Sequence, residues 1–479
     1  MDRRRFITLG GLAVGGVSLL PACGDTTAAA VHLGHTATGG AGAGEAVTTA
    51  EPFTVELPIP PVLRPTAVEG DTEIYDLSVR ETTAEILPGV TTPVLGYNGL
   101  FTGPTIRAKR GKPAIVRVSN QLQHSTNVHL HGGYVAAVDD GHPMDGIDPG
   151  ALREYHYPNQ QQGTTLWYHD HSHHMEAEHV YRGLRGFYVI EDDDEAKLKL
   201  PSGRYDIPIA LSDVAIAADG TLVFDSKFAD RQTILANGKP QPVLRVEARR
   251  YRLRLLNGAL HRLFQLRLPG VDIMQIATDG GLLPAPVLRP ELSLTPAERA
   301  DIVVDFRQAP IGSRLVLEDT TAGAVLAFDV VARADDDSKL PSQLRALPAL
   351  PPATTVRDVA LSFQPTLASF TINGQTFDAN RVDAQIPVGT TEIWQVTNMD
   401  TKYGITHNFH LHLVQFRVLD RDGVPPGPGE AGLKDTVAVP PGSTVRVQAT
   451  FTGFKGRYLY HCHFLEHSAA GMMAQFEVV

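Results

Sequence analysis

The sequence predicts an all-β protein of three consecutive Greek-key β-sandwich domains, and three observations support this. The chain has 479 residues, too many for one hydrophobic core and enough for about three domains of roughly 150 residues each. Its 44 glycines and 34 prolines accompany short runs of Val, Ile, Leu and Thr, such as residues 114–118, which are typical of strands joined by turns. Helical periodicity is scarce, so packed antiparallel sheets are the favoured architecture.

Residues 1–50 are interpreted as a targeting segment and leader rather than as folded structure. Arginines at positions 3–5 precede an apolar run over 7–20, which favours export by the twin-arginine (Tat) machinery over a chance basic N-terminus. The sequence LPAC at 20–23 is typical of a bacterial lipobox, so Cys23 is a candidate lipid anchor, with simple cleavage nearby as the alternative. The low-complexity stretch up to residue 50 predicts a flexible tether. The expected location is therefore the periplasm, the cell envelope or the extracellular space.

The rest of the chain divides into three predicted domains and one linker. The first domain spans 51–195 and ends in an acidic run. The second, 204–334, contains a strand-like run at 251–256 but no cluster of metal ligands, and we interpret it as a spacer. A polar, proline-rich linker over 335–353 leads to the third domain, 354–479.

The most informative segment lies near the C-terminus, where His461, Cys462 and His463 are followed by His467 and Met472. In a strand, alternate side chains point to opposite faces, so the two flanking histidines would point one way and the cysteine the other. A thiolate, an imidazole and a weak thioether supply most of a blue-copper electron-transfer site. One short segment could therefore serve two metal sites.

Three further histidine clusters occur at 129–131 (HLH), 169–171 (HDH) and 407–412 (HNFHLH). With the C-terminal segment they contain ten of the 19 histidines, which chance does not explain. His407 is the candidate for the second imidazole of the blue-copper site.

These four segments resemble the copper-binding motifs of the three-domain multicopper oxidases, the laccase and bilirubin-oxidase family, over the chain from roughly residue 52 to the end. The resemblance implies cupredoxin-like domains and four copper ions per chain. It implies that the type 1 copper is held by His407, Cys462, His467 and Met472. It implies that the type 2 copper is held by His129 and His410, and the type 3 pair by His131, His169, His171, His412, His461 and His463. The spacing agrees, because an H-x-H on a strand puts both imidazoles on one face.

The implied reaction is laccase-like. A phenol or aromatic amine would lose one electron at the type 1 copper, and dioxygen would be reduced by four electrons to water at the three-copper cluster. Cys462, His467 and His407 would carry the electron, and Met472 as axial ligand predicts a moderate potential. The resemblance also suggests that Asp140 relays protons, although an aspartate in the sequence DDG is equally ordinary turn chemistry.

The sequence is also compatible with other functions, to different degrees. A cuprous oxidase ranks second, because the 7 methionines form no Met-rich segment to capture copper(I). A bilirubin oxidase shares the same motifs. A non-catalytic envelope scaffold is disfavoured because the chain keeps all the predicted ligands, and a copper nitrite reductase would not need this full set of paired histidines.

Two positions depart from the pattern of the family: Asn408 stands where a proline is frequent, and Ser468 stands where some bacterial relatives carry glutamate. The ligands themselves are unaffected. Asp170 is expected to make a structural hydrogen bond, and the remaining nine histidines are interpreted as bystanders.

The cysteine count decides whether disulfides are expected, and the net charge limits which partners are expected. Only Cys23 and Cys462 occur, so no disulfide is expected. A formal net charge of −11 argues against nucleic acid and anionic membranes as partners. The expected partners are dioxygen and a small reducing substrate, and a complete ligand set in one chain makes a monomer sufficient.

Overall fold

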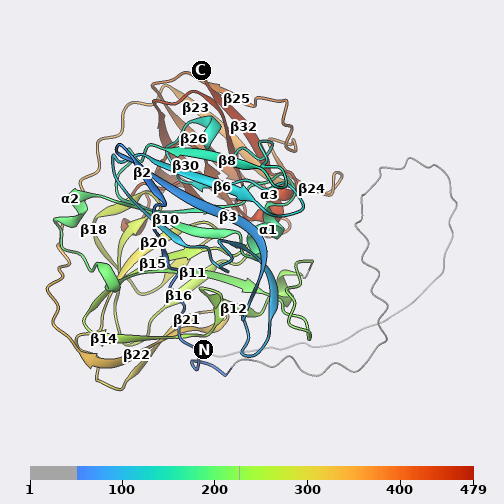
Figure 1. Ribbon diagram of the computed structural model, residues 1–479. Coiled ribbons are helices and arrows are strands. Elements are labelled where there is room, and N and C mark those ends of the chain that lie inside the picture. Colours follow the sequence, from blue (N-terminus) through green and yellow to red (C-terminus); the bar gives the residue numbers. More distant parts are fainter. Residues whose placement is uncertain (1–50, 226) are drawn as a thin grey trace, which may run out of the picture. The chain divides into compact units, whose positions relative to one another are not determined.

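The computed structural model describes residues 51–225 and 227–479, which form six sheets in three consecutive pairs along the chain (Figure 1). Strands are coloured blue to green in the first pair, green to gold in the second and orange to red in the third. The predicted all-β fold class is confirmed. The predicted export signal, the lipobox cysteine Cys23 and the leader lie outside the described residues.

The first pair of sheets contains the first two histidine clusters. One sheet has the order β1 (Val62–Leu63), β5 (Thr105–Lys109), β10 (Arg185–Glu191), β9 (Thr164–His169) and β7 (His129–His131). The other has the order β2 (Ala67–Glu69), β3 (Thr72–Ala84), β6 (Ala114–Asn120) and β8 (Leu152–Tyr157), with β4 (Thr92–Tyr97) paired to β3. The strand expected at 114–118 is thus β6.

The second pair consists of a seven-stranded and a five-stranded sheet. The larger has the order β13 (Lys239–Pro240), β12 (Thr233–Ala236), β11 (Asp206–Val214), β15 (Arg250–Asn257), β20 (Arg299–Asp305), β17 (Ile273–Thr278) and β18 (Gly281–Arg289). The smaller has the order β14 (Val243–Ala248), β22 (Gly323–Arg333), β21 (Arg314–Asp319), β16 (Phe264–Arg267) and β19 (Leu292–Leu294). Residues 334–354, which follow β22, contain no helix or strand.

The third pair contains the last two clusters. Its first sheet has the order β24 (Ser369–Ile372), β23 (Thr355–Gln364), β26 (Thr390–Asn398), β30 (Thr444–Phe451) and β28 (Arg417–Arg421). Its second has the order β25 (Ala384–Ile386), β32 (Met473–Val478), β31 (Gly456–His461), β27 (His407–Leu411) and β29 (Thr436–Val439). The α-helices of the described residues are short: α1 (Glu176–Arg182), α2 (Asp193–Ala196) and α3 (Leu465–Ala469).

Each pair of sheets encloses its own apolar core, because alternate residues of each strand point inward. Val79, Val116 and Leu166 belong to the first core, and Trp394 and Phe476 to the third. The second core is built around β15 and β20. Among the described residues, no helix is long and apolar enough to span a membrane.

The structure corrects one expectation about the histidine pairs. Only the pair on β7 lies wholly within a strand. β9 ends at His169, β27 ends at Leu411 and β31 ends at His461, so the second histidine of each of these pairs follows the strand end. After His461 the chain leaves its strand and soon enters α3, which lets His463 and His467 approach different sites from one short segment.

Candidate metal centre

The register of two strand pairs brings the histidine clusters together. β7 lies antiparallel to β9 with His129 opposite His169, and β27 lies antiparallel to β31 with His410 opposite His461. The two strand pairs then meet, since the rings of His131 and His410 stack with their centroids 3.7 Å apart.

Eight histidines form one continuous cluster of potential ligands, and each is at most 1% exposed. Within the cluster are three triplets whose ligand atoms lie within 4.8 Å of one another. They are His129, His131 and His410; His131, His169 and His463; and His171, His412 and His461. The structure therefore brings together every histidine that the sequence assigned to the type 2 and type 3 coppers.

Hydrogen bonds to backbone carbonyls fix the orientation of four of these rings. In each of these four rings the Nδ1–H group donates to the backbone carbonyl of another residue. The pairs are His129 to Asp140 (2.5 Å), His169 to Asp170 (2.8 Å), His410 to Asp435 (2.8 Å) and His461 to Cys462 (3.0 Å). The buried Nε2 atoms of the first three have no hydrogen-bond partner. A ring held at one nitrogen with the other free is the arrangement that metal-ligating histidines adopt.

Three buried carboxylates hold three further rings. Asp140 Oδ2 lies 2.7 Å from His412 Nδ1, and Asp435 Oδ1 lies 3.0 Å from His131 Nε2. Glu176 Oε2, on α1, lies 2.7 Å from His171 Nδ1. Burial raises the pKa of Asp140 well above its usual value.

Sequence reasoning missed two of these carboxylates. Glu176 lies five residues after His171, at the start of α1, and this closeness in the sequence could have drawn attention to it. Asp435 has no local signal, because it lies far along the chain from the histidine that it contacts.

A second, smaller site consists of His407, Cys462 and His467, whose ligand atoms also lie within 4.8 Å of one another. Cys462 Sγ lies 3.7 Å from His407 Nδ1 and 3.6 Å from His467 Nδ1. His407 Nε2–H donates to Asp400 at 2.7 Å, which turns Nδ1 toward the site. Met472 is fully buried, and its backbone bonds to both Cys462 (3.1 Å) and His467 (3.0 Å).

Asn408 connects this small site to the larger cluster. Its Oδ1 accepts a hydrogen bond from the backbone N–H of His463 at 2.6 Å and lies 3.6 Å from Cys462 Sγ. Its Nδ2 donates to the carbonyl of Pro296 at 2.8 Å, in the segment before β20. Asn408 thus ties three segments together.

Burial keeps the ligands of the metal-free chain in forms suited to binding a metal. It lowers the pKa of His461 to about 4, and it lowers the pKa of His129, His131, His169, His410, His412 and His463 well below the usual value. These imidazoles are therefore neutral, as metal ligation requires. Burial also raises the pKa of the Cys462 thiol to about 12, so a bound metal ion must displace its proton.

The donor set fits copper. A thiolate with two imidazoles is the core of a blue-copper site, to which a methionine such as Met472 can add a weak thioether, and clustered imidazoles suit copper as well. The Nε2 atoms of His129, His169, His171, His410 and His463 have no hydrogen-bond partner, and a bound metal ion would satisfy them.

His467 is the ligand nearest to the molecular surface, with 3% exposure against none for His407 and Cys462. Phe370 stacks on its ring at a centroid distance of 3.9 Å, and His261 meets it edge-on at 5.1 Å. These two aromatic side chains cover much of the His467 ring.

Seven of the histidines interpreted as bystanders are described by the structure, and they lie outside the ligand triplets; His32 and His35 lie outside the described residues. Asp170 makes structural hydrogen bonds, as expected, accepting from Thr126 Oγ1 and from the backbone N–H of Asn127 at 3.2 Å. It also lies 3.1 Å from His179 Nδ1, and His179 in turn meets His124 at 2.9 Å between Nε2 atoms.

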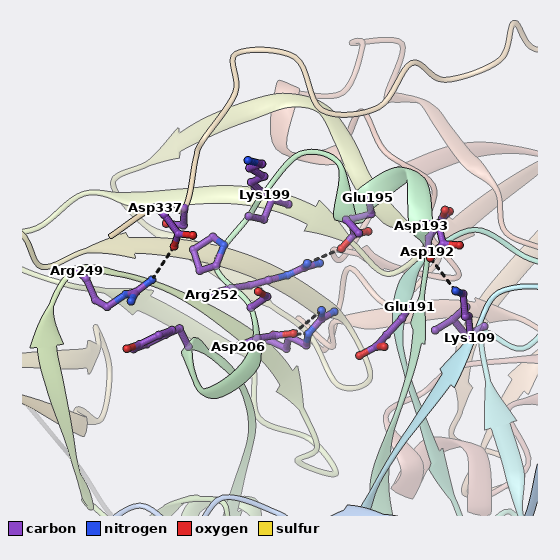
Figure 2. A pocket seen from close by; sticks show the side chains of 18 residues that line it. Lys109, Glu191, Asp192, Asp193, Glu195, Lys199, Asp206, Arg249, Arg252 and Asp337 are labelled. Carbon is purple, nitrogen blue, oxygen red and sulfur yellow. Dashed lines mark hydrogen bonds and ion pairs between the residues drawn. The ribbon is translucent and has the colours of Figure 1, made fainter. Parts of the chain in front are cut away.

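A cavity of about 600 Å³ lies between the first and second pairs of sheets, and none of the predicted ligands lines it (Figure 2). Its charges largely pair with one another: Arg252 contacts Glu195 at 2.5 Å, and Lys109 contacts Asp193 at 2.9 Å. The cavity therefore has the character of a charged interface between sheets.

Comparisons with known proteins agree with this geometry. Family models described as "Multicopper oxidase" match residues 78–195 and 349–479. A laccase of Bacillus subtilis (strain 168) is 35% identical over 514 residues, covering 90% of this chain and 99% of the relative. A bilirubin oxidase of Albifimbria verrucaria is 37% identical over 469 residues, covering 88% and 81%. The crystal structure of a laccase from Pediococcus acidilactici Pa5930 has a TM-score of 0.85 and 33% identity, covering 90% of this chain and 95% of that one. By fold, family models and relatives together, the chain belongs to the multicopper oxidase family and is an oxidase enzyme.

Proposed function

We propose that this protein is a laccase-type oxidase that removes single electrons from phenols or aromatic amines and delivers four of them to dioxygen, giving water. One observation carries the proposal: His461, Cys462 and His463 join a cysteine-containing site to a cluster of eight histidines through consecutive residues. Such a link provides a short covalent route for electrons between two sites.

The proposed ligand assignment follows the sequence analysis. His407, Cys462, His467 and Met472 form the type 1 site, and His129 and His410 form the type 2 site. The triplets His131, His169, His463 and His171, His412, His461 support two adjacent type 3 positions. Four copper ions per chain would supply the one-electron redox chemistry. The surrounding contacts with Asp140, Glu176, Asp400 and Asp435 hold the rings in place.

The protein separates the two half-reactions in space. A substrate would give up its electron at the edge of His467, because this ligand lies next to the surface while His407 and Cys462 are fully buried. The histidine cluster is enclosed, which keeps the oxygen chemistry away from bulk solvent. Asp140 lies against His412 and is the proposed proton relay.

Substitution of Cys462 tests the proposal. We expect Cys462→Ser to abolish an absorption band at about 600 nm and phenol-dependent oxygen uptake, because the copper–thiolate bond is lost. The protein should stay folded, since serine fits the same buried position. A variant that kept its blue colour would refute the assignment of Cys462.

Bilirubin oxidation is the second candidate, favoured by the relative of that name at 37% identity. Oxygen uptake with a simple phenol, bilirubin and copper(I), compared as kcat/KM, decides among the substrates. We expect the phenol to exceed copper(I), because the 7 methionines of the chain form no Met-rich segment. A copper(I) value above that of the phenol would make the protein a metal oxidase.

Export by the Tat system, a lipid anchor at Cys23 and a monomeric state are also proposals. They rest on residues 1–50 of the sequence and on the complete ligand set within one chain.

A further inference from the structure

We infer that Arg299, a residue of the ligand-free second pair of sheets, is a positioning residue for the three-copper cluster. It acts by holding Asp435, which in turn orients His131 from the first pair of sheets and His410 from the third. The inference rests on the proposed function, because it concerns the same copper ligands. It replaces the interpretation of residues 204–334 as a mere spacer.

Arg299 lies on β20 and forms a fully buried, two-pronged ion pair with Asp435. Its Nη2 is 2.6 Å from Asp435 Oδ2 and its Nη1 is 2.8 Å from Asp435 Oδ1. Both side chains are completely buried. A planar guanidinium matches a carboxylate in this way and fixes its orientation as well as its charge.

Asp435 then contacts one ligand from each side of the cluster. Its Oδ1 accepts from His131 Nε2 at 3.0 Å, which leaves His131 Nδ1 buried without a partner. Its backbone carbonyl accepts from His410 Nδ1 at 2.8 Å, which leaves His410 Nε2 without one. Thr436 Oγ1 lies near the same two nitrogens, 3.1 Å from His131 Nε2 and 3.3 Å from His410 Nδ1. Asp435, with this hydroxyl beside it, therefore selects the nitrogen that each stacked ring offers to a metal ion.

Arg299 is itself firmly held by groups from two pairs of sheets. Nε donates to the carbonyl of Thr165 on β9 at 3.0 Å. The backbone N–H of Arg299 donates to Asp279 Oδ1 at 2.8 Å, and Asp279 Oδ2 lies 2.9 Å from Lys434 Nζ. The guanidinium thus cannot shift without breaking contacts to the first and third pairs.

The backbone beside His131 is shaped to admit this ion pair. Gly132 has a φ of +79°, and a Cβ there would lie 2.3 Å from Asp435 Oδ2 and 2.9 Å from Arg299 Nη2. Any side chain at this position would collide with the pair. The absence of one lets the carboxylate approach the neighbouring histidine.

The other two carboxylates that contact histidines of the cluster, Asp140 and Glu176, differ from Asp435 in their ion pairs. Among residues 51–225 and 227–479, no arginine forms an ion pair with Asp140 or Glu176. Asp435 is tied to the second pair of sheets in this way, so Arg299 is a charged link from that pair to the cluster, beside the hydrogen bond from Asn408 to the carbonyl of Pro296.

The test compares Arg299→Lys with the wild-type protein and with Arg254→Lys. Lysine keeps the charge but cannot make the two-pronged contact. Arg254 is a matched control: it makes a buried two-pronged pair with Asp206, at 2.6 and 2.9 Å, in the same sheet, and it contacts none of the predicted ligands. Copper per chain, the paramagnetic-resonance signal of the non-blue copper, the blue band and the dissociation constant in competition with a chelator are measured on each protein.

We expect Arg299→Lys to raise the dissociation constant of the cluster copper by about 10-fold or more and to alter the non-blue signal, as for other residues that orient ligands. The blue band should persist as an internal control, since no contact joins Arg299 to His407, Cys462 or His467. Arg254→Lys should lose stability but keep wild-type copper binding and spectra.

Two results would overturn the inference. If Arg299→Lys kept a wild-type non-blue signal and copper affinity, Arg299 would have no positioning role, and the proposed function would stand. If the wild-type protein bound no cluster copper, both would fall together. Should Arg299→Lys not fold, Asp435→Asn tests the same contact, because it keeps the acceptor oxygen for His131 but removes the charge that Arg299 meets, and an unchanged non-blue signal there would refute the inference.

Discussion

Asp140 is the residue at which proton supply and copper ligation can be separated. Its Oδ2 lies 2.7 Å from His412 Nδ1, and its carbonyl lies 2.5 Å from His129 Nδ1. Asparagine preserves an acceptor oxygen and the backbone contact but cannot carry a proton. We expect Asp140→Asn to slow oxygen reduction by about 100-fold with a normal blue band, measured as oxygen uptake across pH. Asp139→Asn is the control, because Asp139 is also buried but bonds to the backbone N–H of His156, at 2.9 Å. Unchanged turnover in Asp140→Asn would remove Asp140 from the mechanism.

The residues of the candidate site differ in how well the sequence revealed them. The histidines and Cys462 could be found because their spacing repeats and their chemistry is specific. Asp435 could not be singled out, because a lone carboxylate far along the chain resembles any surface acid until the fold places it beside a ring. Glu176 had only its closeness to His171 in the sequence as a signal. Asp140 was suspected only through the family resemblance. Whether it moves protons stays a prediction, while its contact with His412 is plain in the structure.

At the scale of the elements, β11 and β15 run parallel and share a buried ion pair at the edge of the cavity in Figure 2. Asp206 accepts from Arg254 Nε at 2.6 Å and from Arg107 Nη1, on β5, at 3.1 Å. Burial alone would raise the pKa of Asp206, but Arg254 and its neighbouring arginines hold it well below the usual value. Strands of the first and second pairs are thereby joined through one carboxylate.

The ion pair between Asp206 and Arg254 predicts that the free energy of unfolding falls in acid. Because the pKa of Asp206 is lower in the folded chain, its contribution is complete above the unfolded value of about 4 and declines as the pH falls below it. We expect Asp206→Asn to lower the free energy of unfolding by about 3 kcal/mol at neutral pH, with a smaller difference below about pH 4, measured by urea unfolding. Asp329→Asn removes a more exposed pair with Arg314 and should cost less than about 1 kcal/mol. Equal losses in the two variants would contradict the account.

Strands were easier to predict than their ends. The runs at 114–118 and 251–256 became β6 and β15 because alternating apolar residues reach the cores. The end of β31 at His461 was not foreseen, since H-x-H was interpreted as one continuous strand. The helix α3 that follows, and the turn that carries Cys462 toward His407, depend on tertiary contacts that no local pattern contains.

In the molecule as a whole, the ligands of the proposed three-copper cluster come from sheets far apart in sequence. His129 and His169 belong to the first pair of sheets, and His410 and His461 to the third. Copper bound there would join the two pairs, whereas the proposed type 1 ligands His407, Cys462 and His467 all lie in the third. The sequence predicted this division, but it did not reveal that Arg299 of the second pair also reaches the cluster, because that contact depends on how the sheets dock.

Metal removal should therefore destabilise the docking of the sheets. Binding to the folded state alone stabilises by about 4 kcal/mol per site when free metal exceeds its dissociation constant a thousandfold. We expect the chelated protein to have a lower thermal midpoint than the copper-loaded protein, measured by calorimetry. Cys462→Ser should keep most of the stabilisation, because its cluster histidines remain. A chelated protein as stable as the loaded one would show that copper does not join the pairs.

The most direct test of the central claim is a copper count on the loaded protein, with its visible and paramagnetic-resonance spectra recorded on the same sample. The account predicts about four copper ions per chain, an intense absorption band at about 600 nm and separate blue and non-blue copper signals. A folded protein that bound no copper, or that bound it without a blue band, would contradict it.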